Sequence, residues 1–272
     1  MHRFEMSRVA ARPSGSLHGG RANRDWELSP TGDDASCYAA VIGRAKRGKS
    51  TLVDAILDTP LVSSAWYRPT VLPAVIRHAP ALRMAVRSRD AHHQFVTQSI
   101  EPRELRDCLA DRRSADTTVP IALDIGFASP MLANGLWLVD TPAHDPSNDA
   151  PFVPPSIVPR IDIVIAVIDH ESVSLDSELR LIASVPTHSS SRLLVVFNKI
   201  DEVDEDDRRQ TVGFAELALA SRMHGIVPRI YGVSARQRLN GDGRPGDWDE
   251  FLEALWCAIA ELRAAAVTAA SH

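Results

Sequence analysis

Cysteine is scarce in this sequence, with three in 272 residues and no metal-binding or redox spacing among them: Cys37, Cys108 and Cys257. A disulfide-stabilised scaffold or a zinc module would need more cysteines at characteristic spacings, so neither class is expected. The few cysteines predict a reduced, cytoplasmic compartment.

Long hydrophobic runs are also missing. No apolar stretch approaches the roughly 18 residues that a membrane span needs, and the first residues form no hydrophobic signal core. Residues 1–36 lack periodicity, and their first 24 positions carry several arginines against Glu5 alone. They predict a flexible, solvated basic tail; a weak contact with an anionic membrane or a partner is the alternative.

The chain has no excess of positive charge. It holds 30 Lys and Arg against 35 Asp and Glu, a formal net charge of −5, which argues against non-specific nucleic-acid binding as the main activity. Hydrophobic residues make up 44%, enough for a full core. The length suits one large domain or two small ones.

A phosphate-loop pattern, G-x-x-x-x-G-K-[ST], fits residues 43–51 at every fixed position. An apolar run at 37–42 precedes it and a helix-like run at 51–57 follows, which is the strand–loop–helix context that the pattern needs. The two glycines let successive N–H groups point at an anion, and the helix N-terminus adds partial positive charge. Lys49 is predicted to reach the β- and γ-phosphates, and the Ser50 hydroxyl to bind Mg²⁺. The nucleotide-binding residues expected in this loop are Gly43, Lys46, Arg47, Gly48, Lys49, Ser50 and Thr51.

Strand and helix patterns alternate after this loop and predict a doubly wound, mostly parallel α/β sheet with helices on both faces. We expect strands at residues 37–42, 71–77, 81–87, 119–127, 135–139, 161–168, 192–197 and 228–233. Helices are expected at residues 51–57, 101–112, 174–183 and 206–224. Strands 71–77 and 81–87 are predicted to form a hairpin, and Asp247 with Glu250 a capping box on a last amphipathic helix.

A second motif predicts which base is bound. Asn198-Lys199-Ile200-Asp201 follows a buried strand and fits the guanine motif N-K-x-D. The Asp201 carboxylate can accept hydrogen bonds from guanine N1–H and N2–H₂, a pair that adenine lacks, and an unmatched buried polar group penalises the wrong base. Asn198 is expected to tie this loop to the phosphate loop, and the Lys199 stem to lie along the base. Ser234-Ala235-Arg236 is similar to the S-A-K element whose backbone N–H contacts guanine O6.

Two further segments point to the γ-phosphate. Asp140-Thr141-Pro142-Ala143 follows the strand expected at 135–139; the Asp140 carboxylate is predicted to support Mg²⁺, and the Ala143 N–H to meet the γ-phosphate. Thr70 is the candidate for the other switch, with its hydroxyl on Mg²⁺; a plain Pro-Thr turn is the alternative. The predicted metal site is therefore Ser50, Thr70 and Asp140.

These motifs resemble the GTPase domain of dynamin-like proteins, especially bacterial ones. Residues 43–57 are similar to the family's G-E-F-K-R-G-K-S-T-L-[IL]-N-A-L-L, residues 68–77 to P-T-T…V-I-R, and residues 130–142 to P-L-L…G-L-x-L-V-D-T-P-G. The stretch from residue 161 through Asp169 to residue 178 is similar to A-D-x-V-I-F-V…D…S-E. The resemblance implies an expanded P-loop GTPase (G) domain at 37–266 that binds GTP and GDP with Mg²⁺, followed by a disordered end at 267–272.

The chain departs from the family at several points. Ala143 stands where relatives carry glycine, residues 142–159 are rich in proline, and no helical stalk is expected after the domain. His144 takes a position where other GTPases orient the attacking water, and Lys46 and Arg47 could supply a cation to the transition state; an exposed loop histidine and a charged rim are the alternatives. The catalytic candidates are Lys49, Thr70, Ala143, His144 and Lys46.

The sequence thus predicts a GTPase that hydrolyses GTP to GDP as a dynamin-like switch. A nucleotide-gated scaffold with little hydrolysis, docking a stalk-bearing or other partner, is the alternative. A homo- or hetero-dimer through the G domain and a weak peripheral membrane contact are the expected associations, and nucleic acid is not.

Overall fold

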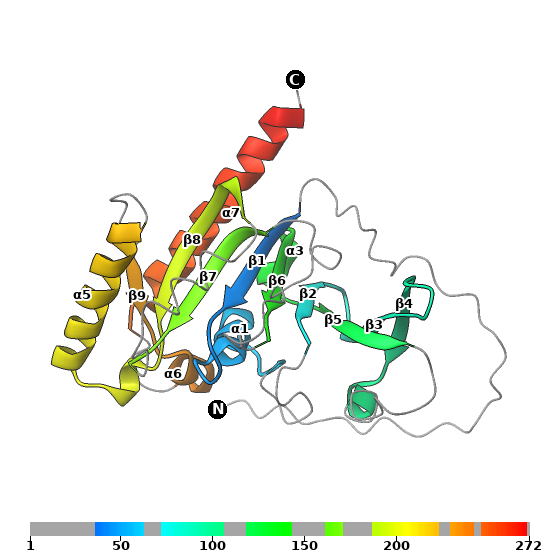
Figure 1. The fold of residues 1–272 in the computed structure, drawn as a ribbon, viewed down its shortest axis with the longest axis horizontal. Helices are drawn as coiled ribbons and strands as arrows, with labels where there is room; N and C mark the ends of the chain where they lie inside the picture. The colour runs from blue at the N-terminus through cyan, green and yellow to red at the C-terminus, as the bar shows by residue number, and fades with distance from the viewer. Residues whose placement is uncertain are drawn as a thin grey trace.

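The computed structural model describes residues 36–62, 72–105, 118–142, 161–170, 187–222, 229–241 and 246–270. These residues form one nine-stranded sheet in the order β4-β3-β5-β2-β6-β1-β7-β8-β9 (Figure 1). The strands are β1 (Cys37–Ile42), β2 (Ala74–His78), β3 (Arg83–Arg89), β4 (Phe95–Ile100), β5 (Val119–Phe127), β6 (Leu136–Asp140), β7 (Ile161–Ile168), β8 (Thr187–Phe197) and β9 (Ile230–Gly232).

The α-helices are α1 (Lys49–Leu57), α3 (Pro130–Ala133), α5 (Glu205–Arg222), α6 (Ala235–Asn240) and α7 (Trp248–Ala270). Two 3₁₀ turns, η2 (Pro102–Glu104) and η3 (Ile200–Glu202), complete the described elements. The predicted α/β fold is confirmed, and its sheet is mixed. The short helices α3 and α6 lack sequence periodicity and were not expected; the helix expected at 174–183 lies outside the described residues.

Five neighbouring strands, β6, β1, β7, β8 and β9, run parallel. Every residue of β1 and β7 is buried, as continuous apolar runs predict for strands covered on both faces. Because these strands are parallel, their carboxyl ends meet at one edge of the sheet, and the loops that follow them are brought together there.

The hairpin predicted between strands 71–77 and 81–87 is wrong. β5 lies between β2 and β3: it pairs in parallel with β2 and antiparallel with β3. A short connection favours a hairpin between neighbouring strands. Here each of the two strands pairs with the long strand β5 instead, and no local sequence pattern reveals that pairing. The actual hairpin joins β3 to β4. Its turn is held by the Asp90 carboxylate, which accepts hydrogen bonds from the N–H groups of His92 and Gln94 at 2.9 and 2.8 Å.

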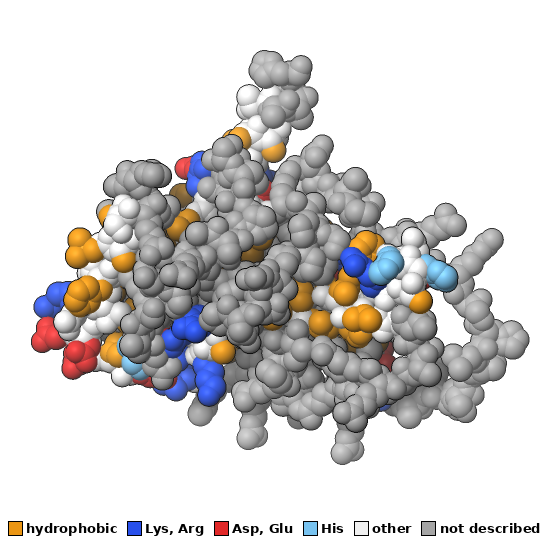
Figure 2. Space-filling model, in the orientation of Figure 1, with side chains coloured by type: hydrophobic (Ala, Val, Ile, Leu, Met, Phe, Trp, Pro, Cys, Tyr) orange, Lys and Arg blue, Asp and Glu red, His pale blue; other side chains and the backbone are white. Residues whose placement is uncertain are grey.

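Helices cover opposite faces of the sheet. Alternation along β8 divides its side chains: Val196 joins the core with α1 and α7, whereas Val195 and Phe197 pack against α5. The outer side of α5 exposes Phe214 and Leu217, at 63% and 71%, and apolar side chains gather over this helix in the space-filling view (Figure 2).

The last helix, α7, follows Asp247 directly. The Asp247 carboxylate accepts the Gly232 N–H at 2.8 Å, and Arg208 lies 3.4 Å from the same oxygen, so this side chain joins the start of the helix to β9 and α5. The capping box of Asp247 with Glu250 stays a prediction. At the other end α7 runs to Ala270, past the boundary expected at 266. Within the described part of the chain, none of the helices combines the length and hydropathy needed to cross a membrane.

Candidate functional site

The phosphate loop lies between β1 and α1 and has the backbone its glycines predict. Gly43 has φ 153°, and a Cβ there would lie 2.6 Å from the Val167 carbonyl oxygen of the neighbouring strand. Gly48 has φ 85°, and a Cβ there would collide with the Asn198 amide. A side chain at either position is therefore strained and crowded, which explains why glycine occupies both.

Lys49 is buried at the start of α1, and its ammonium donates to the Arg44 carbonyl at 2.9 Å. The charge thus lies over the loop between β1 and α1, where a phosphate would bind at the helix N-terminus. Thr51 follows in the first turn of α1 and is half-buried.

The two cations that precede Gly48 differ sharply. Arg47 is 8% exposed, and its Nη1 lies 2.5 Å from the Asp169 carboxylate, which is fully buried at the end of β7. Lys46 is exposed and has a left-handed backbone with φ 64°. Arg47 is therefore engaged by an internal carboxylate, and Lys46 is the cation of the pair that faces solvent.

Ser50 and Asp140 come together from α1 and β6. The Ser50 hydroxyl donates to Asp140 Oδ2 at 2.7 Å, and the Asp140 side chain is fully buried. Next to it, the Thr141 hydroxyl donates to the Val41 carbonyl at 2.7 Å and fixes the end of β6 against β1. Hydroxyl and carboxylate oxygens are the ligands that Mg²⁺ prefers, so this pair fits the predicted metal.

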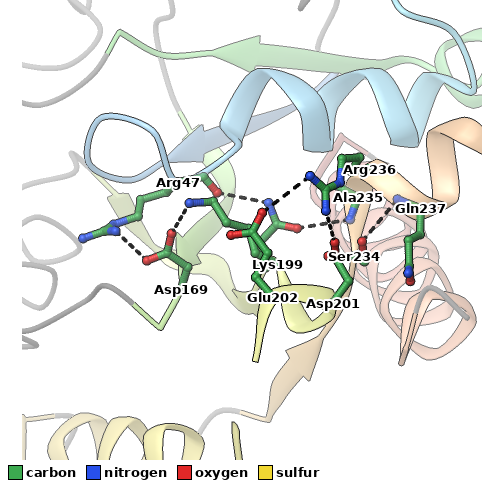
Figure 3. Close-up of polar contacts among 10 residues, drawn as sticks. Arg47, Asp169, Lys199, Asp201, Glu202, Ser234, Ala235, Arg236 and Gln237 are labelled. Carbon is green, nitrogen blue, oxygen red and sulfur yellow. Dashed lines mark hydrogen bonds and ion pairs between the residues drawn. The ribbon is translucent and has the colours of Figure 1, made fainter. Parts of the chain in front are cut away.

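Asn198 joins three loops through one buried side chain. Its Nδ2 donates to the Arg47 carbonyl at 3.0 Å, and its Oδ1 accepts the Ala235 N–H at 3.1 Å. The hydrogen bond predicted between Asn198 and the phosphate loop is present. Ser234, fully buried, caps α6 by accepting the Gln237 N–H at 3.2 Å, which orients the third loop (Figure 3).

Asp201, the last residue of the guanine motif, forms an ion pair with Arg236 (Figure 3). The Asp201 side chain is 7% exposed and that of Arg236 is 63% exposed, so the carboxylate is the fixed partner. Burial alone would raise the pKa of Asp201, but hydrogen bonds from Ser234 and Arg236 outweigh it and lower the pKa below the ordinary aspartate value. Arg236 also lies 3.6 Å from Glu202.

Lys199 connects the guanine motif back to the phosphate loop. It has a left-handed backbone with φ 64°, and its ammonium lies 2.7 Å from Asp169 Oδ2. Asp169 lies in the stretch that resembles the family, but the sequence predicts no role for it. A charged residue directly after eight buried strand residues is the signal that could have singled it out.

Three candidate residues, Thr70, Ala143 and His144, lie outside the described residues. The structure brings together the others, from Gly43 to Ser50, Asp140, Asn198 to Asp201 and Ser234 to Arg236, at one edge of the sheet. Among the described residues there is no cluster of three His, Cys, Asp or Glu side chains that could hold a metal without other ligands.

A glycine loop between a buried strand and a helix, at the carboxyl edge of a parallel sheet, defines the phosphate-loop class of α/β proteins. The model of the Dynamin family matches residues 39–200. That match spans more than half of the 272 residues, and the chain belongs to the dynamin family, as the sequence motifs predicted.

Two solved structures share the fold, and both are of an oligomerised bacterial dynamin pair that provides a mechanism for long-range sensing and tethering of membranes. The first has a TM-score of 0.65 and 14% identity, covering 87% of this chain and 41% of that chain. The second has a TM-score of 0.62 and 15% identity, covering 85% of this chain and 40% of that one. The chain thus spans about two fifths of the length of each. Among curated proteins no sequence matches it.

Proposed function

We propose that this chain binds guanine nucleotides and hydrolyses GTP to GDP and phosphate as a dynamin-like switch. The observation that carries the proposal is the Asn198 side chain, which holds the phosphate loop and the Ser234-Ala235-Arg236 loop together beside Asp201. One buried amide thereby brings the expected phosphate-binding and base-binding elements to the same place.

Base selection is assigned to Asp201. Its ionised carboxylate, with a lowered pKa, would accept guanine N1–H and N2–H₂. The stem of Lys199 would lie along one face of the base, and the backbone near Ala235 would meet guanine O6. Adenine would leave the carboxylate unmatched, and that cost is the basis of selectivity.

Phosphate charge is assigned to Lys49 and to the N–H groups of the loop between Gly43 and Thr51. Ser50, Thr70 and Asp140 would hold Mg²⁺, the last through the buried carboxylate that already accepts the Ser50 hydroxyl. When bound, the ion supplies neutralisation of charge on the β- and γ-phosphates.

For hydrolysis, water attacks the γ-phosphorus, the bond to the β–γ bridging oxygen breaks, and GDP and phosphate are released. We assign orientation of the water to His144 and a contact with the γ-phosphate to the Ala143 N–H. Lys46 is the cation proposed to spread transition-state charge, since Arg47 is held by Asp169.

The proposal is tested by calorimetric titration of the purified chain with GTP, GDP and ATP, with Asp201→Asn as the variant. We expect GTP and GDP to bind and ATP not to, and Asp201→Asn to lose the preference. ATP binding as tight as GTP binding would contradict the assignment. A single-turnover assay of His144→Ala then tests the catalytic role, which an unchanged rate would exclude.

A nucleotide-gated binding module with little hydrolysis is the second candidate. Ala143 in place of glycine restricts the backbone of the switch, and the prolines at 142–159 restrict it further. GTP turnover measured at rising protein concentration separates the two candidates: turnover at any concentration supports the enzyme, and none supports the module.

We also propose that the chain dimerises through its G domain and contacts membranes only peripherally from the cytoplasm. The support is the shared fold with an oligomerised bacterial dynamin pair described as tethering membranes. Analytical ultracentrifugation with GDP and GTP, and liposome co-sedimentation, test the two associations separately.

A further inference from the structure

Asp169 joins the two nucleotide loops through its side chain. Oδ1 lies 2.5 Å from Arg47 Nη1 of the phosphate loop, and Oδ2 lies 2.7 Å from Lys199 Nζ of the guanine motif. Figure 3 shows the carboxylate between the two cations. Asp169 thus contacts one residue of each loop that the proposed function uses.

The three charged groups are buried or partly buried, so breaking this contact costs more free energy than breaking a surface ion pair. The Asp169 side chain is fully buried, and the side chains of Arg47 and Lys199 are 9% and 21% exposed. A buried carboxylate is tolerated when it is paired, and loss of its charge would leave two cations beside each other. The pairing therefore stabilises both loops in their positions relative to the end of β7.

A second connection runs beside this one through the backbone. Asn198, adjacent to Lys199, donates to the carbonyl of Arg47, whose side chain Asp169 holds. Asn198 thus contacts the main chain of Arg47 directly, and Lys199 is connected to the Arg47 side chain through Asp169. A displacement of the guanine motif must break one of these contacts or move Arg47.

We infer that Asp169 is a positioning residue that couples base recognition to phosphate binding. It acts through Arg47 and Lys199, and it keeps the Asp201 carboxylate at the distance from the phosphate loop that a guanine nucleotide spans. The inference rests on the proposed function, because it assigns how two parts of that same site are kept in register.

The test compares GDP with IDP, which lacks the exocyclic 2-amino group and so reports how well Asp201 meets the base. Kd values for both ligands are measured by calorimetry for the wild type and Asp169→Asn. We expect GDP affinity to fall at least about tenfold and the preference for GDP over IDP to narrow. A purely structural role would weaken both ligands equally, and that result would overturn the inference, as would unchanged affinities.

Asp162→Asn is the matched control. Asp162 is 4% exposed, lies near the start of β7 whereas Asp169 follows its end, and accepts the Tyr38 N–H at 2.8 Å. This variant should lower the melting temperature and leave the preference for GDP over IDP unchanged.

If Asp169→Asn does not fold, Arg47→Gln gives the second measurement, because Lys199 still neutralises Asp169 there. A narrowed preference supports the inference, and an unchanged one overturns it. Failure of the wild type to bind either nucleotide would instead contradict the proposed function.

Discussion

Asn198 and Arg47 are 151 positions apart in sequence, and the Asn198 amide donates to the Arg47 carbonyl at 3.0 Å. The same amide accepts the Ala235 N–H, so both ends of the side chain are paired while only 3% of the residue is exposed. A buried amide with both ends paired holds its neighbours in one geometry, since breaking either bond leaves a polar group unsatisfied.

Asn198→Ala should weaken GDP binding by at least about tenfold, because it leaves the Arg47 carbonyl and the Ala235 N–H without this partner. Isothermal calorimetry measures the loss. Asn198→Asp keeps an acceptor for Ala235 but places a buried carboxylate against the Arg47 carbonyl, and should weaken binding at least as much. Asn240→Ala, at an exposed position at the end of α6, is the control that should bind like the wild type.

Ser50→Ala should abolish the dependence of nucleotide affinity on Mg²⁺. The hydroxyl that donates to Asp140 is the proposed ligand, and a methyl group can neither bind the ion nor orient the carboxylate. GDP Kd values are measured with Mg²⁺ and with a chelator. Ser221→Ala, on the exposed side of α5, should keep the wild-type response; a Ser50→Ala protein that also keeps it would remove Ser50 from the metal site.

Arg236→Ala should raise the pKa of Asp201. The Arg236 guanidinium is one of the hydrogen-bond donors that keep this pKa below its ordinary value of 3.8. A carboxyl group whose pKa is lowered in the folded state stabilises the fold at any pH above its ordinary pKa. This stabilisation is lost as the pH falls through the pKa of the folded state. In the variant the loss should therefore begin at higher pH.

The pKa is followed by ¹³C NMR of the Asp201 carboxyl carbon, assigned with Asp201→Asn. Arg209→Ala is the control, since Arg209 is 69% exposed and pairs with Glu205 on α5 instead. An Asp201 titration that is identical in wild type and Arg236→Ala would show that the ion pair does not set this pKa.

Arg87→Met should destabilise the fold by about 3–5 kcal/mol, because it leaves the Asp124 carboxylate buried without its main partner. Arg87 Nη2 lies 3.0 Å from Asp124 Oδ1, with 10% and 1% of the two side chains exposed. Replacing both, as Arg87→Met with Asp124→Leu, should recover most of the loss, although Arg77 then loses a nearby opposite charge. Urea unfolding measures each variant.

The surface pair Arg192–Glu261, with side chains 44% and 61% exposed, is the control for that comparison. Arg192→Met should cost no more than about 1 kcal/mol. A cost equal to that of Arg87→Met would contradict the argument from burial.

Burial raises the pKa of Asp124, so the folded state holds this proton more tightly than the unfolded chain. Its contribution to stability falls as pH rises from the ordinary value through the raised one, and the double variant should lack this dependence.

Features carried by local sequence were predictable. β5 and β7 have the bounds that their apolar runs indicated, 119–127 and 161–168, and α5 lies within two residues of its predicted ends. β4 was missed because its residues are mostly exposed on an edge strand and show no apolar alternation.

The site divides in the same way. The phosphate loop and the guanine motif were identified from spacing, since each motif is continuous in sequence. The Asp169 contacts were not, because Asp169 acts only through residues that the sheet brings to it. The direction of the Arg47 side chain, toward Asp169, depends on the parallel pairing of β1 with β7.

The residues alone therefore specify a nucleotide-binding α/β protein of the dynamin family, because its motifs and buried strands are local patterns of residue type. Which strands become neighbours, and which buried charges meet, depends on contacts between distant segments. β5 separates β2 from β3, and Asp169 joins Arg47 to Lys199, because the sheet places these segments side by side, and buried charges are stable only where opposite charges reach them.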